Sequence, residues 1–210
     1  MTYIRFLQHN SIFFSLLVYI LGLTLLLKKK QISKLDAIIV YCFSLDSFFN
    51  FFTRLIDIIK ENKKIVAFSY DLLFPLFIVS IVVYPKRKNL SAGLVIGLTI
   101  AFQLFDRFSK LLPTLEGLKI GLSFIACLAL LYVVFKNIQR ARFQIFMLLL
   151  LAGIPFLDIF FNAAFFRYIP FEMSIWIVFL SGYIIYSIIA YSLFIYYYGK
   201  QVFKYPSTII

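Results

Sequence analysis

Long apolar stretches alternate with short polar connectors along almost the whole chain. Seven stretches approach or reach the ~17–25 residues that an α-helix needs to cross the hydrocarbon of a bilayer. They cover residues 11–27, 35–55, 65–84, 90–105, 118–135, 143–166 and 171–198. No stretch shows the alternation of a transmembrane β-barrel, and lipid leaves backbone polar groups only helices or closed barrels. The pattern therefore predicts an all-α fold, a polytopic membrane bundle of seven transmembrane helices.

Composition favours the same class. Hydrophobic residues make up 63% of the 210 residues and charged residues 14%, whereas soluble domains are about 45–50% apolar and about 25% charged. The connectors are too short to hold a soluble domain. We therefore expect a single transmembrane domain over residues 1–210, in a multi-pass protein of the cell inner (cytoplasmic) membrane that is surrounded by membrane lipid.

The distribution of charge predicts the orientation. With the amino terminus outside and the carboxyl terminus in the cytoplasm, the inner connectors hold twelve of the 21 basic residues, as the positive-inside rule favours. These residues also suit attraction to anionic lipids of the cytoplasmic leaflet. Apart from Asp36, every acidic residue falls in the outer half or the outer loops, which favours a polar site open to the outer face. Basic residues lie mainly between the apolar spans and do not form one face, so nucleic acid is not a predicted partner.

Two of the apolar stretches carry the same polar motif. Residues 45–50 (LDSFFN) in the second stretch return as residues 157–162 (LDIFFN) in the sixth. On an α-helix, Asp46, Asn50 and Arg54 form one stripe, because they recur every four residues. The sixth stretch repeats this stripe, with the basic residue displaced by one, as Asp158, Asn162 and Arg167.

A carboxylate near the middle of a membrane helix costs ~2.5–3.5 kcal/mol on insertion scales, so such a residue usually faces the protein interior and is functional. The two stripes therefore predict a paired ligand-binding site. The alternative is that each aspartate only bonds neighbouring polar side chains and locks helix packing. Asp71 joins the candidate ligand-binding residues, although a capping or interfacial role also suits it.

The repeated motif is compatible with an internal duplication. A 3+1+3 repeat would pair the first three spans with the last three around a linking fourth span, a plan similar to that of small sugar transporters of the SWEET type. The Pro-Gln pair of the related PQ-loop proteins is absent, which weakens a transport function. Trp176 and the run of tyrosines at 196–198 are typical of an interfacial aromatic belt.

Several absences narrow the chemistry. His9 is the only histidine and lies outside the spans, which excludes a three-histidine zinc hydrolase and an intramembrane Ser-His dyad. The last span has no lysine for a retinal Schiff base, and no Gly-rich phosphate loop occurs. Cys42 and Cys127 lie within apolar spans, where thiols behave as small hydrophobes. The sequence thus predicts no cofactor and no metal site.

Residues 43–46 (FSLD), with the span that ends at residues 74–84, resemble the first acidic helix pair of bacterial lysoplasmalogenase-like membrane hydrolases. Residues 156–158 (FLD), with the closing helix at 183–191, resemble the second pair. The resemblance implies hydrolysis of the vinyl-ether bond of a lysolipid, with Asp46 and Asp158 as the catalytic acid-base pair. The chain departs from the family at Leu45, where a glycine is usual, and it has one span fewer. It is also similar to seven-helix bacterial membrane proteins with presumed sensory roles.

The leading hypothesis is a ligand-binding or sensory membrane protein with an outward-facing polar pocket. Asp46 and Asp158 would supply charge or hydrogen bonds, and Asn50 and Asn162 would orient the ligand. The partner would be a signalling protein or a lipid-like ligand. Hydrolysis and small-solute transport are the alternatives. Hydrolysis would require the two carboxyl groups to lie within roughly 3–6 Å.

Overall fold

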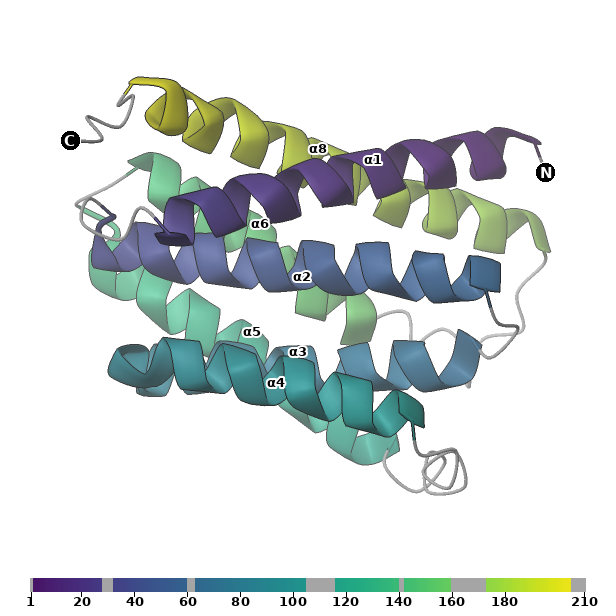
Figure 1. Cartoon of the computed structure of the whole chain (residues 1–210), viewed down its shortest axis with the longest axis horizontal. Coiled ribbons are helices and arrows are strands. Elements are labelled where there is room, and N and C mark those ends of the chain that lie inside the picture. Colours follow the sequence, from purple (N-terminus) through teal and green to yellow (C-terminus); the bar gives the residue numbers. More distant parts are fainter. Residues whose placement is uncertain are drawn as a thin grey trace. The chain divides into compact units, whose positions relative to one another are not determined.

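The computed structural model is helical through nearly all of the residues that it describes, which are 2–27, 32–59, 63–104, 116–139, 142–159 and 173–204. These ranges hold seven α-helices, one 3-10 helix and no strand (Figure 1). The helices are α1 (Thr2–Leu27), α2 (Lys34–Ile59), α3 (Lys63–Val83), η2 (Pro85–Arg87), α4 (Lys88–Leu104), α5 (Glu116–Asn137), α6 (Arg142–Ile159) and α8 (Met173–Lys204). The predicted all-α class is confirmed, and each apolar stretch has its helix.

Two helices, within the described ranges, are long and apolar enough to cross a membrane. Their apolar segments are Lys34–Phe52 and Leu118–Asn137. Four shorter apolar helical segments are Ile12–Leu27, Leu72–Val83, Asn89–Leu98 and Arg142–Leu157. The number of helices is thus as predicted, while seven membrane crossings stay a prediction.

The helices group into two compact units. One holds Met1–Phe51 and Met173–Ile210, and the other holds Phe52–Glu172. We call them the α1–α2–α8 unit and the α3–α6 unit. Helices from both ends of the chain share the first unit, so the units do not coincide with the halves of a 3+1+3 repeat. The repeat and the single transmembrane domain stay predictions.

In the α1–α2–α8 unit, the buried faces of α1 and α8 follow a spacing of three and four residues. The faces are formed by Ser15, Val18, Gly22 and Leu25 in α1, and by Ile184, Ser187, Tyr191, Phe194 and Tyr198 in α8, where Ala190 and Gly199 are buried as well. This spacing is typical of helices that pack along much of their length, and α1 packs against α8.

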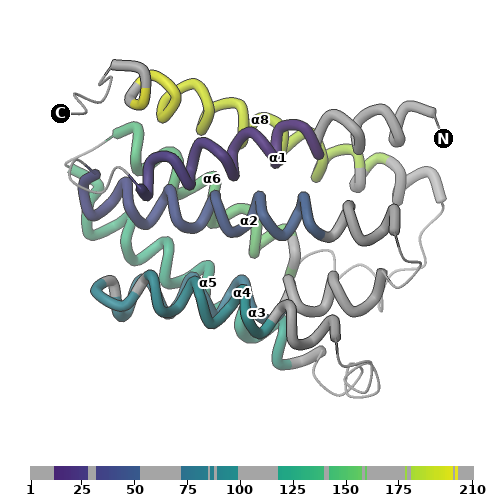
Figure 2. The backbone as a smooth tube through the Cα atoms, viewed as in Figure 1, coloured from purple at the N-terminus to yellow at the C-terminus, as the bar shows by residue number. Residues whose placement is uncertain are grey.

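Helix α1 also lies beside α2 (Figure 2). A Cβ atom added at Gly22 would overlap the Ser44 hydroxyl and lie 2.9 Å from the Ser44 Cβ. The Ser44 hydroxyl itself donates a hydrogen bond to the Val40 carbonyl at 2.6 Å. A glycine is therefore required at this contact, because only a residue without a side chain lets the two helices approach so closely.

In the α3–α6 unit, α3 packs against α4 and α5, and α5 packs against α6. The turn between α3 and α4 is closed by backbone hydrogen bonds from Tyr84 to Ser80 (2.8 Å) and from Arg87 to Tyr84 (3.0 Å). The Ser80 and Ser91 hydroxyls share a hydrogen bond of 2.7 Å across this hairpin. Figure 1 shows that α3 and α5 run in the same direction, so the α3–α4 and α5–α6 turns lie at the same end of the unit.

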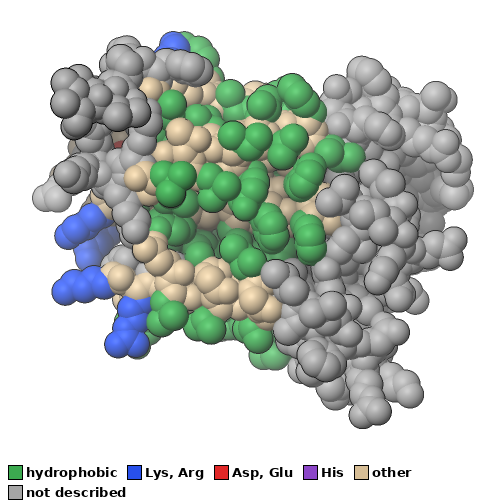
Figure 3. Space-filling view, in the orientation of Figure 1, with side chains coloured by type: hydrophobic (Ala, Val, Ile, Leu, Met, Phe, Trp, Pro, Cys, Tyr) green, Lys and Arg blue, Asp and Glu red, His purple; other side chains and the backbone are tan. Residues whose placement is uncertain are grey.

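Many large apolar side chains remain exposed in both units, and hydrophobic side chains cover much of the described surface in Figure 3. In α1 they include Phe13, Ile20 and Leu27. In α5 they include Phe124, Ile125, Leu128, Tyr132 and Phe135. A soluble monomer rarely leaves contiguous apolar surface of this kind uncovered.

Candidate functional site

Asp46 lies in the middle of α2, within a segment in which almost every residue is buried. Only 1% of its surface is exposed. Its neighbours along the helix are apolar or small, and the serines at 44 and 47 turn their hydroxyls back to α2 carbonyls. A carboxyl group in such surroundings must find hydrogen-bond donors within the protein, because water does not reach it.

Tyr191 and Asn50 are two described side chains that supply such donors. The Tyr191 hydroxyl donates to Asp46 Oδ2 at 2.5 Å. Asn50 Nδ2 donates to the Tyr191 hydroxyl at 2.8 Å and lies 3.4 Å from Asp46 Oδ1. The same Asn50 nitrogen also lies 3.2 Å from the Asp46 backbone carbonyl. We call Asp46, Asn50 and Tyr191 the Asp46 cluster.

The cluster joins two helices that are far apart in sequence. Asp46 and Asn50 are one turn apart on α2, on the shared stripe expected from their spacing. Tyr191 comes from α8, where it occupies one of the buried positions that recur every three or four residues. The hydrogen bonds therefore fix the rotation of α8 relative to α2 at this level of the unit.

The side chains of the other candidate site residues lie outside the described part of the chain. Arg54 and Asp71 belong to α2 and α3, and Asp158 belongs to α6, but their side chains lie outside the described part. Asn162 and Arg167 lie outside the described residues altogether. Asp46 and Asp158 belong to different units. Their pairing stays a prediction.

Tyr191 is the member of the cluster that the sequence did not single out. A signal was available, because Ser187, Tyr191 and Tyr198 place hydroxyls on one face of an apolar helix, at spacings of four and seven residues. A buried hydroxyl on such a face needs a partner. What the sequence lacked was the identity of the facing helix.

A second buried aspartate lies at the beginning of α2. Ser33 immediately precedes the helix, and its hydroxyl donates to Asp36 Oδ2 at 2.6 Å while the Asp36 backbone nitrogen donates to Ser33 Oγ at 3.1 Å. The bond from the Asp36 backbone nitrogen is an N-cap hydrogen bond, with Ser33 as the N-cap residue. The Tyr198 hydroxyl donates to Asp36 Oδ1 at 2.8 Å. Asp36 thus has a structural role in starting α2 and attaching it to α8.

The interfacial-belt interpretation is wrong for Tyr198. Its ring is fully buried and its hydroxyl is bound to Asp36, whereas Tyr196 is exposed and carries Lys200 over its ring at 3.8 Å. The three tyrosines look alike in sequence. On a helix, however, successive residues point about 100° apart, so only one of the three can face α2.

Aromatic rings in edge-to-face and tilted contact connect the two aspartate–tyrosine pairs. Phe43 lies 6.4 Å from Tyr191 and 5.1 Å from Phe194, between ring centroids, and Phe194 lies 4.8 Å from Tyr198. Asp36 bonds to Tyr198, and Asp46, which comes later in α2, bonds to Tyr191, which comes earlier in α8. The two helices are therefore antiparallel. We call this contact, from Asp36 to Asn50 and from Tyr191 to Tyr198, the α2–α8 seam.

Replacement of Tyr198 by phenylalanine should lower the free energy of unfolding by about 1.5 kcal/mol, because it removes one donor from a buried carboxylate. The effect should fall at the low end for a charged hydrogen bond, since Ser33 still donates to Asp36. Denaturant unfolding in detergent micelles would measure it. Tyr196→Phe is the matched control and should change stability by less than about 0.5 kcal/mol. Equal effects of the two variants would contradict the assignment.

Within the described part of the chain, no group of three His, Cys, Asp or Glu side chains could hold a metal ion. The described residues of the Asp46 cluster offer one carboxylate, one amide and one phenol. This set can accept hydrogen bonds from a cationic amine or a hydroxyl group, and it can donate through the amide and the phenol.

The chain matches no protein-family model, no curated protein sequence and no solved structure. Its function therefore has to be inferred from the cluster itself.

Proposed function

We propose that the chain is a multi-pass membrane protein that binds a small ligand at the Asp46 cluster, in a ligand-binding or sensory role. The observation that carries the proposal is the Asp46 carboxyl group, almost completely buried in an apolar helix and bonded to Tyr191 from another helix. The ligand class that suits this cluster carries an amine or hydroxyl donor, and lysolipids with an amine headgroup belong to that class.

Membrane placement is supported by the surface as well as by the composition. Exposed apolar side chains continue along α1 and α5, and in the α3–α6 unit four exposed basic side chains gather at the end that carries both turns. A surface of this kind would be unfavourable in water but is stable in lipid, with the basic end at the cytoplasmic leaflet.

A ligand explains Asp46 better than packing alone does. Asp36 has an evident structural task, because its carboxyl group accepts from the hydroxyl of Ser33, the residue that caps α2, and from the Tyr198 hydroxyl of α8. Asp46 lies mid-helix, where the backbone N–H groups already bond to the preceding turn. A serine or asparagine could join α2 to Tyr191 with a smaller desolvation penalty than a carboxylate incurs. The presence of an ionisable side chain at this position therefore favours a ligand-binding role.

The decisive experiment compares two variants, Asp46→Asn and Asp36→Asn. The second is the control, because Asp36 is the other buried aspartate of the same unit. Thermal unfolding of the purified protein would be measured with small primary amines, polyols and lysophosphatidylethanolamine. A ligand at about 100 times its dissociation constant should stabilise the wild type by about 2.7 kcal/mol. The shift should persist in Asp36→Asn and disappear in Asp46→Asn.

Equal shifts in both variants, or no shift of the wild type by any of these donors, would contradict the proposal. The same preparations separate the alternatives. Aldehyde release from a vinyl-ether lysolipid, lost in Asp46→Asn, would instead assign the hydrolase activity that the family resemblance implies. Flux of a labelled solute into proteoliposomes would assign transport.

A further inference from the structure

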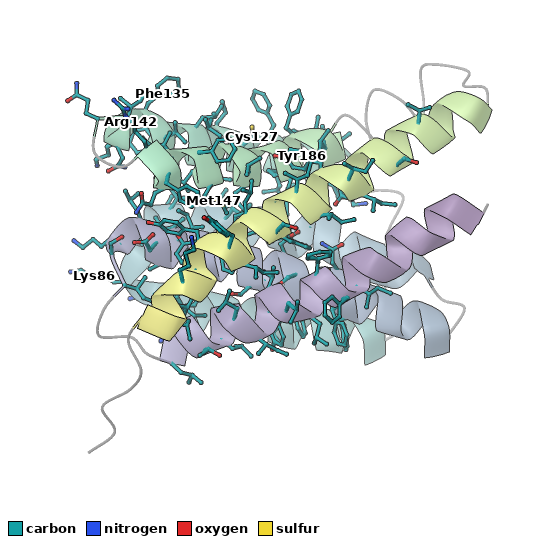
Figure 4. The ribbon with its side chains drawn as sticks, turned by 90° about the horizontal axis from the view of Figure 1, so that it is seen from above. Lys86, Cys127, Phe135, Arg142, Met147 and Tyr186 are labelled. Carbon is teal, nitrogen blue, oxygen red and sulfur yellow. The ribbon has the colours of Figure 1, made fainter. Side chains whose placement is uncertain are left out.

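The end of the α3–α6 unit that carries both turns is strongly basic. Lys86 and Arg87 lie in the 3-10 turn between α3 and α4, Lys136 lies in the last turn of α5, and Arg142 begins α6; all four side chains are exposed. Lys86 and Arg142 project from the same end of the unit in Figure 4. We call these four residues the basic end.

No acidic residue offsets this charge in the adjoining sequence. Residues 80–92 and 130–146, which contain the two turns and the adjoining helix ends, hold six basic residues and neither aspartate nor glutamate. A cluster of this size next to apolar helices is typical of surfaces that bind anionic lipid headgroups.

Large apolar side chains lie immediately beside the basic end. Phe135 is 70% exposed, Tyr84 63% and Ile138 55%. The Lys136 ammonium lies 5.7 Å from the centroid of the exposed Tyr132 ring, one helical turn away. Charged groups and a collar of exposed apolar and aromatic groups thus lie side by side, a combination that suits the headgroup and the upper acyl chain of a phospholipid.

We propose that the basic end binds the headgroups of anionic phospholipids, with Phe135, Tyr84 and Ile138 against the upper acyl chains. This inference rests on the membrane placement in the proposed function, but not on the Asp46 cluster. A soluble anion or an acidic peptide would neutralise the charge and leave the apolar collar in water. A phospholipid covers both. Arginine can donate two parallel hydrogen bonds to phosphate oxygens. Lysine instead attracts the phosphate as a point charge.

The test uses the full-length protein, purified in a neutral detergent and mixed with equal amounts of phosphatidylglycerol and phosphatidylcholine of the same chain length. Native mass spectrometry counts the lipids that remain bound. The wild type should retain phosphatidylglycerol preferentially, and Lys86→Gln/Arg87→Gln and Lys136→Gln/Arg142→Gln should each weaken the preference, by about fivefold for each charge removed. Lys119→Gln, near the other end of α5, is the matched control and should leave it unchanged.

Added salt should lower the preference of the wild type, which tests the inference without any variant. Equal retention of the two lipids by the wild type, or an unchanged preference in both paired variants, would overturn it. Asp46→Asn should keep the lipid preference while it loses the response to amine ligands. Failure of this inference and failure of the Asp46 proposal therefore give different results.

Discussion

Tyr191→Phe is expected to lower the free energy of unfolding by about 1.5–3 kcal/mol, because it removes the donor closest to a buried carboxylate. The phenylalanine ring would keep the ring contact with Phe43, which has a centroid distance of 6.4 Å. The loss should therefore report the hydroxyl alone. Asn50 would lose its 2.8 Å acceptor at the same time. Unfolding by denaturant in micelles of one detergent, at constant protein concentration, would measure the change.

A double-mutant cycle makes this prediction specific to the pair. Asp46→Leu should also be destabilising, since it leaves the Tyr191 hydroxyl buried without its acceptor. In the double variant Asp46→Leu/Tyr191→Phe neither partner remains, and the loss should be smaller than the sum of the two single losses, by about 1–3 kcal/mol. Tyr132→Phe, at an exposed position, serves as the control for loss of a hydroxyl. Additive single losses would show that the two side chains do not interact.

Gly22→Ala should be destabilising by about 1–3 kcal/mol, because the added methyl group would overlap Ser44 and push α1 away from α2. Rotation of the Ser44 hydroxyl cannot relieve the clash, since the Ser44 Cβ would lie at 2.9 Å from the new atom. Thermal unfolding compared with Gly182→Ala would test this. A Cβ atom at Gly182 meets nothing within 4 Å, so this variant should be neutral or slightly stabilising through its helix propensity.

The exchange of the two residues gives a second test of the same contact. Ser44→Gly alone should cost about 0.5–1 kcal/mol through backbone entropy. Combined with Gly22→Ala, it should restore stability, because loss of the Ser44 side chain on α2 makes room for the new methyl group on α1. A double variant less stable than Gly22→Ala would mean that Ser44 is not the residue that limits the approach of α1.

The helices and part of the cluster could be predicted from the sequence alone. Seven apolar stretches give seven helices, because apolar runs bounded by charged connectors carry a strong local signal. Asp46 and Asn50 lie together because their spacing of four residues determines it on any α-helix. Ser33, three residues before Asp36, is also a local signal for the start of a helix.

Contacts between helices were beyond the reach of a single sequence. Tyr191 and Tyr198 bond to α2 from more than 140 positions away, and periodicity within one helix does not identify the helix that faces it. The same limit applies to Gly22, which looks like any other glycine until Ser44 is placed beside it. The proposed partnership of Asp46 with Asp158 depends on a contact of this kind, and it stays a prediction.

The aromatic rings in the α2–α8 seam have a consequence for proton movement. Phe43 and Phe194 are fully buried and lie between the Asp46 and Asp36 pairs. Neither ring has a group that could pass a proton. A change in protonation at one carboxyl group is therefore not expected to reach the other through these rings.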